Sequence, residues 1–288
     1  MGKHDQVRSD ELSTLARQWQ ADLASWAIPA SILDQAPQSP WIHPVEMFAV
    51  DEAIPDSPSH QRAREALLDI EDPGLGASVL DVGCGGGRAA LALVPPATQL
   101  TGVDHQEGML ESFAAAAQRA GVGHRQVLGD WPQVQQEVPV HDVVVCHHVA
   151  YNVADLVPFL RALDRHARRR VVLELPAVHP LSHLNGLWKR FWDLDRPTRP
   201  TASDVQRIAQ ALGLAPRMQT WTDPSWGSRA SLSAADRIRF ARIRLCLPVE
   251  REPEVAAALA ELHDAGVEPP REVATLWWDV PSDRIVQA

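Results

Sequence analysis

Cysteine, tyrosine and long apolar runs are scarce in this chain of 288 residues. Its three cysteines, Cys84, Cys146 and Cys246, lie far apart and form no CxxC pair. The sequence therefore predicts neither a disulfide framework nor a zinc site, and it fits a reducing cytoplasm. No run of about 18 apolar residues predicts a membrane span, and residues 1–19 lack the apolar centre of a signal peptide.

Basic residues are in the minority, since 27 Lys and Arg stand against 37 Asp and Glu, a formal net charge of −10. Nucleic-acid binding needs clustered Lys and Arg, so this balance disfavours a general nucleic-acid binder. One dense basic run exists, Arg165–Arg170. We interpret it as the positive last turn of a helix, a position that the helix dipole favours.

Short apolar runs alternate with helical patterns from Ala77 onward. The expected strands cover residues 78–83, 99–104, 125–130, 141–149 and 169–176, and the expected helices cover 87–94, 107–120 and 153–168. This alternation predicts an α/β fold with a parallel sheet and helices on both faces. Two later strands, 215–222 and 272–280, complete a seven-stranded, mostly parallel, doubly wound sheet.

Helical segments flank this core. Residues 8–27 carry apolar side chains at spacings of three and four, and residues 57–70 predict a second helix with Ser57 or Ser59 as its cap. After residue 178 an aromatic, basic insertion precedes a capped helix at 201–213 and a broken helical segment at 233–263. We therefore expect an N-terminal helical cap (1–56), a core (57–178), and a helical insertion with the last two strands (179–288).

The first strand ends in a glycine-rich loop, VLDVGCGGGR, from Val79 to Arg88. Glycines let the backbone adopt strained dihedral angles and let a ligand approach the main chain closely. Dinucleotide-binding loops prefer G-x-G-x-x-G. Counted from Gly83, the third glycine of that pattern would fall at Arg88. The loop therefore disfavours NAD as the ligand.

The order D-x-G-C-G-G-G, with an acid at the end of the second strand, resembles the class I S-adenosylmethionine-dependent methyltransferases. The resemblance covers roughly residues 57–178 and, more weakly, the last two strands; it implies a Rossmann-like methyltransferase fold and S-adenosylmethionine as the cofactor. In that family the loop passes under the methionyl and ribose portion, which implies contacts at Gly83, Cys84, Gly85 and Gly87. Asp81 would offset the positive charge of the ligand, or else satisfy turn amides.

The resemblance extends to the ends of the second and third strands. Asp104 is expected to bind both ribose hydroxyls, and it also suits a helix N-cap. His105 and Met109 would lie near the adenine, although Met109 also suits packing. The LGDWP segment implies contacts with the adenine at Gly129, Asp130 and Trp131. The alternative is a turn followed by a core tryptophan.

Candidate catalytic residues follow the fourth strand, because ligands bind at the carboxyl ends of parallel strands. His147 and His148 are candidates for a general base, since imidazole titrates near pH 6.5, and His147 is also a candidate cofactor contact. In the alternative interpretation, one of these two histidines stacks on the ligand or caps the next helix, and the other is only packed. Adjacent strand residues point to opposite faces, so we expect no metal site there. Tyr151, the single tyrosine, and Asn152 are expected to orient the substrate.

The acceptor is expected to be covered by segments outside the core. Trp41 and His43 are one candidate cover, and the insertion with His179, His183 and Asn185 is another. Trp188 and Trp192 are four residues apart and therefore share a helix face, which lines the substrate or packs on the sheet.

The sequence thus predicts transfer of a methyl group to oxygen or nitrogen of a small-molecule acceptor by in-line displacement. Alternatives are a methyltransferase for tRNA or protein, a non-catalytic cofactor-binding protein, and an NAD-dependent enzyme. The tRNA or protein alternative needs a basic track, for which the candidates are Lys189, Arg190, Arg196 and Arg199. The oligomeric state is left open, and a homodimer is compatible with the sequence.

Overall fold

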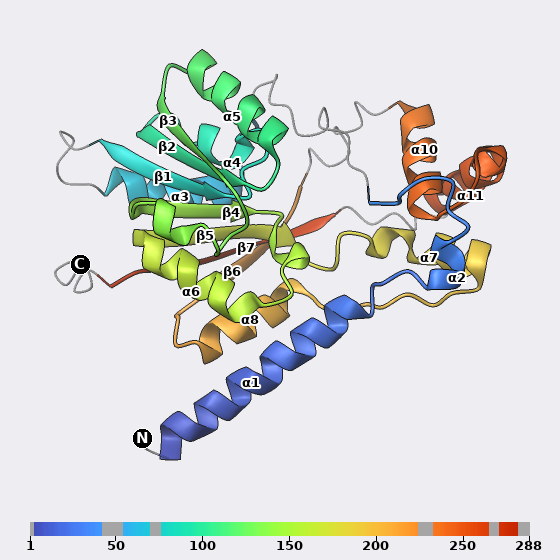
Figure 1. Ribbon diagram of the computed structural model, residues 1–288, viewed down its shortest axis with the longest axis horizontal. Coiled ribbons are helices and arrows are strands. Elements are labelled where there is room, and N and C mark those ends of the chain that lie inside the picture. The colour runs from blue at the N-terminus through green and yellow to red at the C-terminus, as the bar shows by residue number, and fades with distance from the viewer. Residues whose placement is uncertain (1–2, 42–53, 70–75, 224–232, 265–270, 282–288) are drawn as a thin grey trace.

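The computed structural model describes residues 3–41, 54–69, 76–223, 233–264 and 271–281. Its centre is a seven-stranded sheet with the strand order β3-β2-β1-β4-β5-β7-β6 (Figure 1). The strands are β1 (Ala77–Val82), β2 (Ala97–Asp104), β3 (Gly123–Leu128), β4 (His141–His147), β5 (Ala167–Pro176), β6 (Arg217–Thr222) and β7 (Glu272–Asp279). The first five strands pair in parallel, and β7 pairs antiparallel with both β5 and β6. The predicted fold is confirmed.

Helices cover both faces of the sheet because alternate residues of each buried strand point in opposite directions. The helices against the sheet are α3 (Pro58–Leu68), α4 (Arg88–Leu91), α5 (Glu107–Arg119), α6 (Leu156–His166) and α8 (Ala202–Ala211). On one face Leu80 and Val82 of β1 share a core cluster with Leu160 of α6. On the other face Val79 packs with Leu67 of α3 and with α5. β2 and β4 flank β1, so the order of the strands across the sheet reverses at β1.

A separate helical lobe lies beside the sheet (Figure 1). It consists of α2 (Ala30–Leu33), α7 (Asn185–Trp192), α10 (Ala234–Arg244) and α11 (Glu252–Asp264). These helices share a third apolar cluster that includes Ile32, Trp188, Leu245 and Val255. The long helix α1 (Lys3–Ala24) packs along α8. The predicted insertion therefore joins the C-terminal helices and α2 in one lobe.

Trp188 and Trp192 of α7 pack within the helical lobe and not on the sheet. Trp188 belongs to the cluster of the lobe, and the Trp192 indole Nε1 donates to the carbonyl of Leu245 at 2.7 Å. The expected packing on the sheet was therefore wrong, because the C-terminal helices supply a nearer apolar surface.

Two local predictions also differ from the structure. The helix expected at 87–94 is only four residues long, Arg88–Leu91, and it stops before Pro95 and Pro96, which lack the N–H that a helix needs. Of the basic run, only Arg165 and His166 lie in the last turn of α6, and the arginines from Arg168 onward already belong to β5. Partners on neighbouring elements hold them there, such as Asp142 at 3.6 Å from Arg168.

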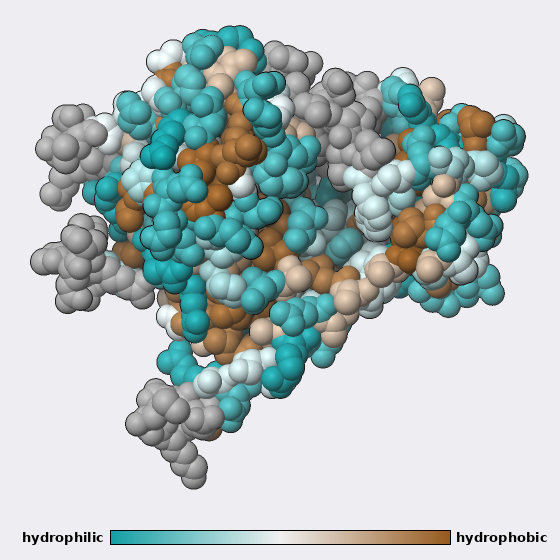
Figure 2. Space-filling model, in the orientation of Figure 1, coloured by the Kyte–Doolittle hydropathy of each residue, from teal (hydrophilic) through white to brown (hydrophobic). Residues whose placement is uncertain are grey.

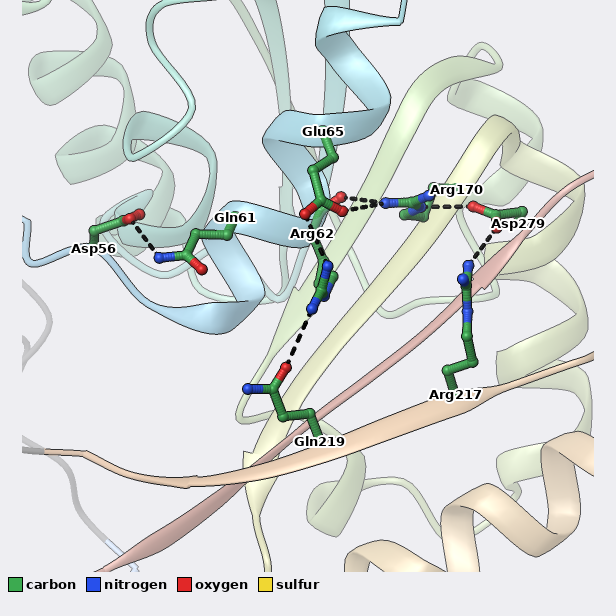
Figure 3. A network of polar contacts seen from close by, with 8 residues as sticks. All are labelled: Asp56, Gln61, Arg62, Glu65, Arg170, Arg217, Gln219 and Asp279. Atoms are coloured by element: carbon green, nitrogen blue, oxygen red, sulfur yellow. Dashed lines mark hydrogen bonds and ion pairs between the residues drawn. The ribbon is translucent and has the colours of Figure 1, made fainter.

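A polar network anchors α3 to the sheet (Figure 3). Arg170 of β5 contacts Asp279 of β7 at 2.6 Å and Glu65 of α3 at 3.2 Å. Arg217 of β6 also pairs with Asp279, and Arg62 of α3 pairs with Glu65 at 2.8 Å. Ser57 caps α3 by accepting from the His60 N–H, as predicted. The network thus fixes the position of the middle of α3 over β5 and β7.

Candidate active site at the carboxyl ends of the strands

The glycine loop needs glycine at two positions for steric reasons. Gly83 has φ +70°, and a Cβ there would lie 2.4 Å from Val149 Cγ2. Gly87 has φ +89°, and its Cβ would lie 2.7 Å from a ring carbon of Phe113. L-residues rarely adopt such angles, and no real Cβ tolerates such distances. The loop therefore lies tightly between the segment after β4 and helix α5.

Main-chain hydrogen bonds tie this loop to the end of β2. The N–H groups of Gly83 and Cys84 both donate to the carbonyl of Val103, at 2.8 and 3.0 Å. The Gly85 N–H donates to Asp104 Oδ2 at 3.0 Å. Cys84 is buried, and its burial raises the pKa of the thiol, so this cysteine is inert packing in the loop.

Asp104 stands at the junction of β2 and the glycine loop. Its Oδ1 accepts from the Gln106 N–H at 3.0 Å, so each carboxylate oxygen already holds one backbone amide. An ionised carboxylate offers about four lone-pair sites, and two remain for a ligand. Gln106, and not Asp104, is the N-cap of α5, so the N-cap alternative for Asp104 was wrong. The backbone amides that Asp104 holds are compatible with a ligand contact.

Asp81 is deeply buried, with 1% of its surface exposed. Its Oδ2 accepts from the Ala90 N–H at 3.2 Å, which is the turn-amide role. Burial raises the pKa of Asp81 to about 7; the bond from Ala90 opposes this shift and the nearby charge of Asp104 adds to it. Two carboxylates thus lie close together beneath the loop, an arrangement that favours a cation.

The end of β3 lies beside Asp104, because the Gly129 N–H donates to the Asp104 carbonyl at 2.9 Å. Asp130 is exposed there, whereas Trp131 is 8% exposed and its ring packs edge-on against His166. The burial of Trp131 agrees with the core-tryptophan alternative, and its contact with the adenine stays a prediction. His105 is exposed beside Asp104, and Met109 is buried in the first turn of α5.

The two histidines after β4 contact the same carboxylate. His148 Nε2 lies 3.0 Å and His147 Nδ1 lies 3.9 Å from Glu174 Oε1. The expectation that they point to opposite faces was wrong, because β4 ends at His147 and His148 adopts the left-handed region with φ +61°. Within the described part of the chain, no group of three or more His, Cys, Asp or Glu is arranged to hold a metal ion.

Glu174 is the functional candidate that sequence reasoning missed. It is 9% exposed and accepts from the Ser57 hydroxyl at 3.4 Å. The His60 ring stacks on His147 with centroids 5.7 Å apart. Two buried nitrogens, His60 Nδ1 and His147 Nε2, have no hydrogen-bond partner among the described residues. The single signal in the sequence is a glutamate inside the otherwise apolar run VVLELP.

Tyr151 is held in the core. Its hydroxyl donates to the Pro176 carbonyl at 2.9 Å, and its ring stacks on Trp19 and contacts His179 edge-on. Burial raises the pKa of the phenol well above its ordinary value. The structure thus gives Tyr151 a packing role, whereas its neighbour Asn152 is exposed.

The basic track that an RNA acceptor would need is neutralised. Lys189 pairs with Asp193 and Asp195, and Arg199 pairs with Asp22 and Asp204. Arg190 pairs with Glu261. Arg196 lies over the rings of Trp26 and Trp188 and donates to main-chain carbonyls.

The two candidate covers of the acceptor differ in what the structure shows. Trp41 is exposed, and His43 lies outside the described residues. His179 stacks on Trp26 at 3.7 Å, Asn185 donates to the Pro197 carbonyl at 3.0 Å, and His183 is exposed. The surface is hollowed between the sheet body and the helical lobe, and the visible part of the hollow is hydrophilic (Figure 2).

Comparison with known proteins agrees with this architecture. Residues 79–170 match the family model described as a methyltransferase domain. A ubiquinone biosynthesis O-methyltransferase of Pseudomonas paraeruginosa is 34% identical over 93 residues, which are 31% of this chain and 39% of the relative. A protein of Haemophilus influenzae is 32% identical over 97 residues, or 33% of this chain and 36% of the relative. The chain thus spans less than two fifths of the length of these curated relatives.

Solved structures share the fold at low identity. A methyltransferase from Geobacter sulfurreducens, solved with S-adenosyl-L-homocysteine, has a TM-score of 0.51 and 16% identity over 83% of this chain and 98% of its own. Coclaurine N-methyltransferase has a TM-score of 0.50 and 13% identity over 95% and 94%. No helix in the described ranges combines the length and apolarity that crossing a bilayer requires. Residues 79–170 thus match a methyltransferase domain, and the sheet around them has the fold of the solved methyltransferases.

Proposed function

We propose that this protein transfers the methyl group of S-adenosylmethionine to an oxygen or nitrogen of a small-molecule acceptor. The observation that carries the proposal is the glycine loop, which hydrogen bonds hold between the acidic ends of β1 and β2, with the acidic end of β3 alongside. The cofactor bears a sulfonium and an ammonium. A bare main chain surrounded by carboxylates suits that charge better than it suits a pyrophosphate.

Each acid has a distinct part in this proposal. Asp104 keeps lone pairs for the ribose hydroxyls beside the amides that it already holds. Asp130 is exposed at the end of β3 and accepts from the exocyclic amine of the adenine. Burial raises the pKa of Asp81 to about 7, so the cationic methionyl end, once bound, favours the ionised form of this carboxyl and is attracted by it. Gly83, Cys84, Gly85 and Gly87 supply main chain, and the exposed His105 covers the nucleoside.

Methyl transfer is an in-line displacement at the methyl carbon, and the cofactor supplies an activated electrophile. The protein therefore has to align the acceptor with the C–S bond and to exclude water. The hollow beside the carboxyl ends of the strands is the place for the acceptor (Figure 2).

Two observations favour a small acceptor over RNA or a protein. The net charge is −10, and the four candidate cations of the basic track are engaged by carboxylates or aromatic rings. The Pseudomonas relative is named an O-methyltransferase of ubiquinone biosynthesis, which agrees with a small molecule. A non-catalytic protein would bind the cofactor without turning over any acceptor. The cytoplasmic location stays a prediction from the sequence.

The Asp104→Asn substitution tests the cofactor site. Loss of the carboxylate weakens the hydrogen bonds to the ribose, so we expect at least about a tenfold weaker binding of S-adenosylhomocysteine, about 1.4 kcal/mol, by calorimetry. Asp69→Asn, an exposed change at the end of α3, is the matched control and should leave affinity unchanged. Equal affinity of Asp104→Asn and wild type would refute the ribose contact.

A further inference from the structure

His148 is bound to Glu174 through both its main chain and its side chain. The His148 N–H donates to the Glu174 carbonyl at 2.6 Å, and the ring Nε2 lies 3.0 Å from Glu174 Oε1. The left-handed backbone at φ +61° brings the ring to this position. A non-glycine residue in that region is uncommon and costs conformational energy, and such residues cluster at functional sites.

Groups from three elements face this pair. His147 comes from β4, Ser57 and His60 from α3, and Thr275 from β7, opposite Glu174 in the sheet. Ser59 of α3 contacts Thr275 at 2.6 Å and also hydrogen bonds to Glu174. Burial disfavours the carboxylate, but the facing imidazoles and hydroxyls outweigh it and hold the pKa of Glu174 well below its ordinary value. Glu174 is therefore an anion.

The other two imidazoles are unsuited to proton transfer. Burial lowers the pKa of His147 to about 3, and burial also lowers the pKa of His60. Both rings are therefore neutral at physiological pH and weakly basic. The His148 side chain is 33% exposed, whereas that of His147 is 10% exposed and His60 is buried, so His148 is the imidazole of the cluster that an acceptor reaches.

The bond to Glu174 selects one tautomer of the His148 ring. A carboxylate only accepts, so Nε2 carries the proton and the lone pair of the neutral ring lies on Nδ1. A buried anion behind an imidazole also stabilises the imidazolium that forms when the ring takes up a proton. Glu174 thus positions the ring as a base.

The pair also lies next to the proposed cofactor site. Val149, the residue after His148, packs against the glycine loop so closely that a Cβ on Gly83 would lie 2.4 Å from it. His148 is therefore adjacent in the chain to a residue that contacts the glycine loop, and this loop is the proposed site of the methionyl portion of the cofactor.

We propose that His148 is the general base of the methyl transfer, that Glu174 is its positioning residue, and that the acceptor is a neutral hydroxyl compound. The inference rests on the proposed function. The acceptor O–H proton moves to His148 Nδ1 as an oxygen lone pair forms the O–CH3 bond. The C–S bond breaks, its electron pair stays on sulfur, and the imidazolium later releases its proton to water. A neutral amine attacks with its free lone pair and needs no base at that step.

The acceptor class is tested with a panel of phenols and alcohols and their matched amines, assayed with methyl-labelled S-adenosylmethionine. We expect methylation of at least one hydroxyl compound and a fall in kcat of about 100-fold or more in His148→Gln, with affinity for S-adenosylhomocysteine within about twofold of wild type. His124→Gln, at the start of β3, is the control and should keep the wild-type rate. The inference would be overturned if only amines were methylated, if no hydroxyl compound were methylated, or if kcat were unchanged in His148→Gln.

The positioning role has a readout that needs no cofactor. Nitrogen NMR of the His148 ring should show the Nε2–H tautomer in the wild type, and Glu174→Gln should lose that preference because an amide both donates and accepts. The kcat of Glu174→Gln should also fall about tenfold or more at unchanged affinity for S-adenosylhomocysteine. An Nδ1–H ring in the wild type, or an unchanged kcat in Glu174→Gln, contradicts the assignment. A wild-type protein that does not bind S-adenosylhomocysteine would instead refute the proposed function.

Discussion

Asp81 shows how a single residue is shaped by the site around it. It lies in β1 between the apolar residues Leu80 and Val82, and among the described residues the Ala90 N–H is the group that donates to its carboxylate. Burying a charge without a full set of partners is costly, so the group keeps its proton to a higher pH than usual. A cationic ligand above it would reverse that preference.

This gives a prediction for the pH dependence of stability. The pKa of Asp81 is raised from 3.8 to about 7, so the folded state binds more protons than the unfolded chain between these values. The contribution of Asp81 to the free energy of unfolding is full below about pH 4. It is lost as the pH rises through about 7, and the loss amounts to up to roughly 4 kcal/mol. Asp81→Asn should remove this decline, so thermal unfolding from pH 5 to 8 should find the ligand-free variant more stable than wild type at pH 8.

Buried histidines such as His147 and His179, whose pKa values are lowered to about 3, change stability in the opposite sense, because they resist protonation at low pH. The difference between wild type and Asp81→Asn isolates the carboxylate. A pH profile that is identical in the two proteins would show that Asp81 is ionised normally in the folded state.

Single residues also mark how far the sequence predicted the site. The acids and glycines were found because they follow apolar strands, and parallel strands bring their carboxyl ends together. Glu174 was missed because its partners come from α3 and β7, about a hundred residues away on either side. The sequence did not predict that Trp131 is buried and contacts His166, since the residue type alone does not tell a ring's neighbours.

At the scale of elements, helix α3 links the outer strands to the candidate active site. Its first turn supplies Ser57 and His60 to the cluster around Glu174, and its later turns pair with Arg170 through Glu65. The same arginine pairs with Asp279 of β7 and donates to the Arg62 carbonyl at 2.7 Å (Figure 3). The position of α3 therefore depends on a half-buried guanidinium with three acceptors.

Arg170→Met should destabilise the protein by about 1–2 kcal/mol, because it leaves Glu65, Asp279 and a carbonyl without their shared donor. Urea unfolding measures the change. The matched control is Arg190→Met, which removes an ion pair with Glu261 on the exposed surface and should leave stability unchanged. An equal effect of the two substitutions would mean that the network does not anchor α3.

Elements were predicted well where pattern and length agree, as in β1, β2, β4 and α5. Boundaries failed where tertiary partners decided them. The basic run was predicted to be the end of a helix because the helix dipole favours positive charge there. In the structure Arg168 and Arg170 belong to β5. Arg168 pairs with Asp142, and Arg170 pairs with Glu65 and Asp279. Charge pattern along the chain contains no information about such distant carboxylates.

At the scale of the whole molecule, an aromatic stack joins the sheet body to the helical lobe. Trp26 stacks on His179, which contacts Tyr151, and the Trp26 indole donates to the Arg199 carbonyl at 2.5 Å. Arg196 lies over both Trp26 and Trp188 of the lobe. Trp26 therefore connects α1, the segment after β5 and the lobe.

Trp26→Ala should destabilise the protein by about 3 kcal/mol and detach the lobe, because a buried indole and its hydrogen bond are lost. Hydrogen exchange should accelerate in α7 and α10 and stay unchanged in β1 and β4. Trp41→Ala, at a position that is 48% exposed, should change neither region. Acceleration throughout the sheet would show that lobe and body unfold as one unit.

The central claim, that the loop at the end of β1 binds a sulfonium nucleoside, is tested most directly by calorimetric titration of the wild-type protein. We predict one site for S-adenosylhomocysteine, competed by S-adenosylmethionine, and no binding of NAD. Binding of NAD without binding of either nucleoside would contradict the account.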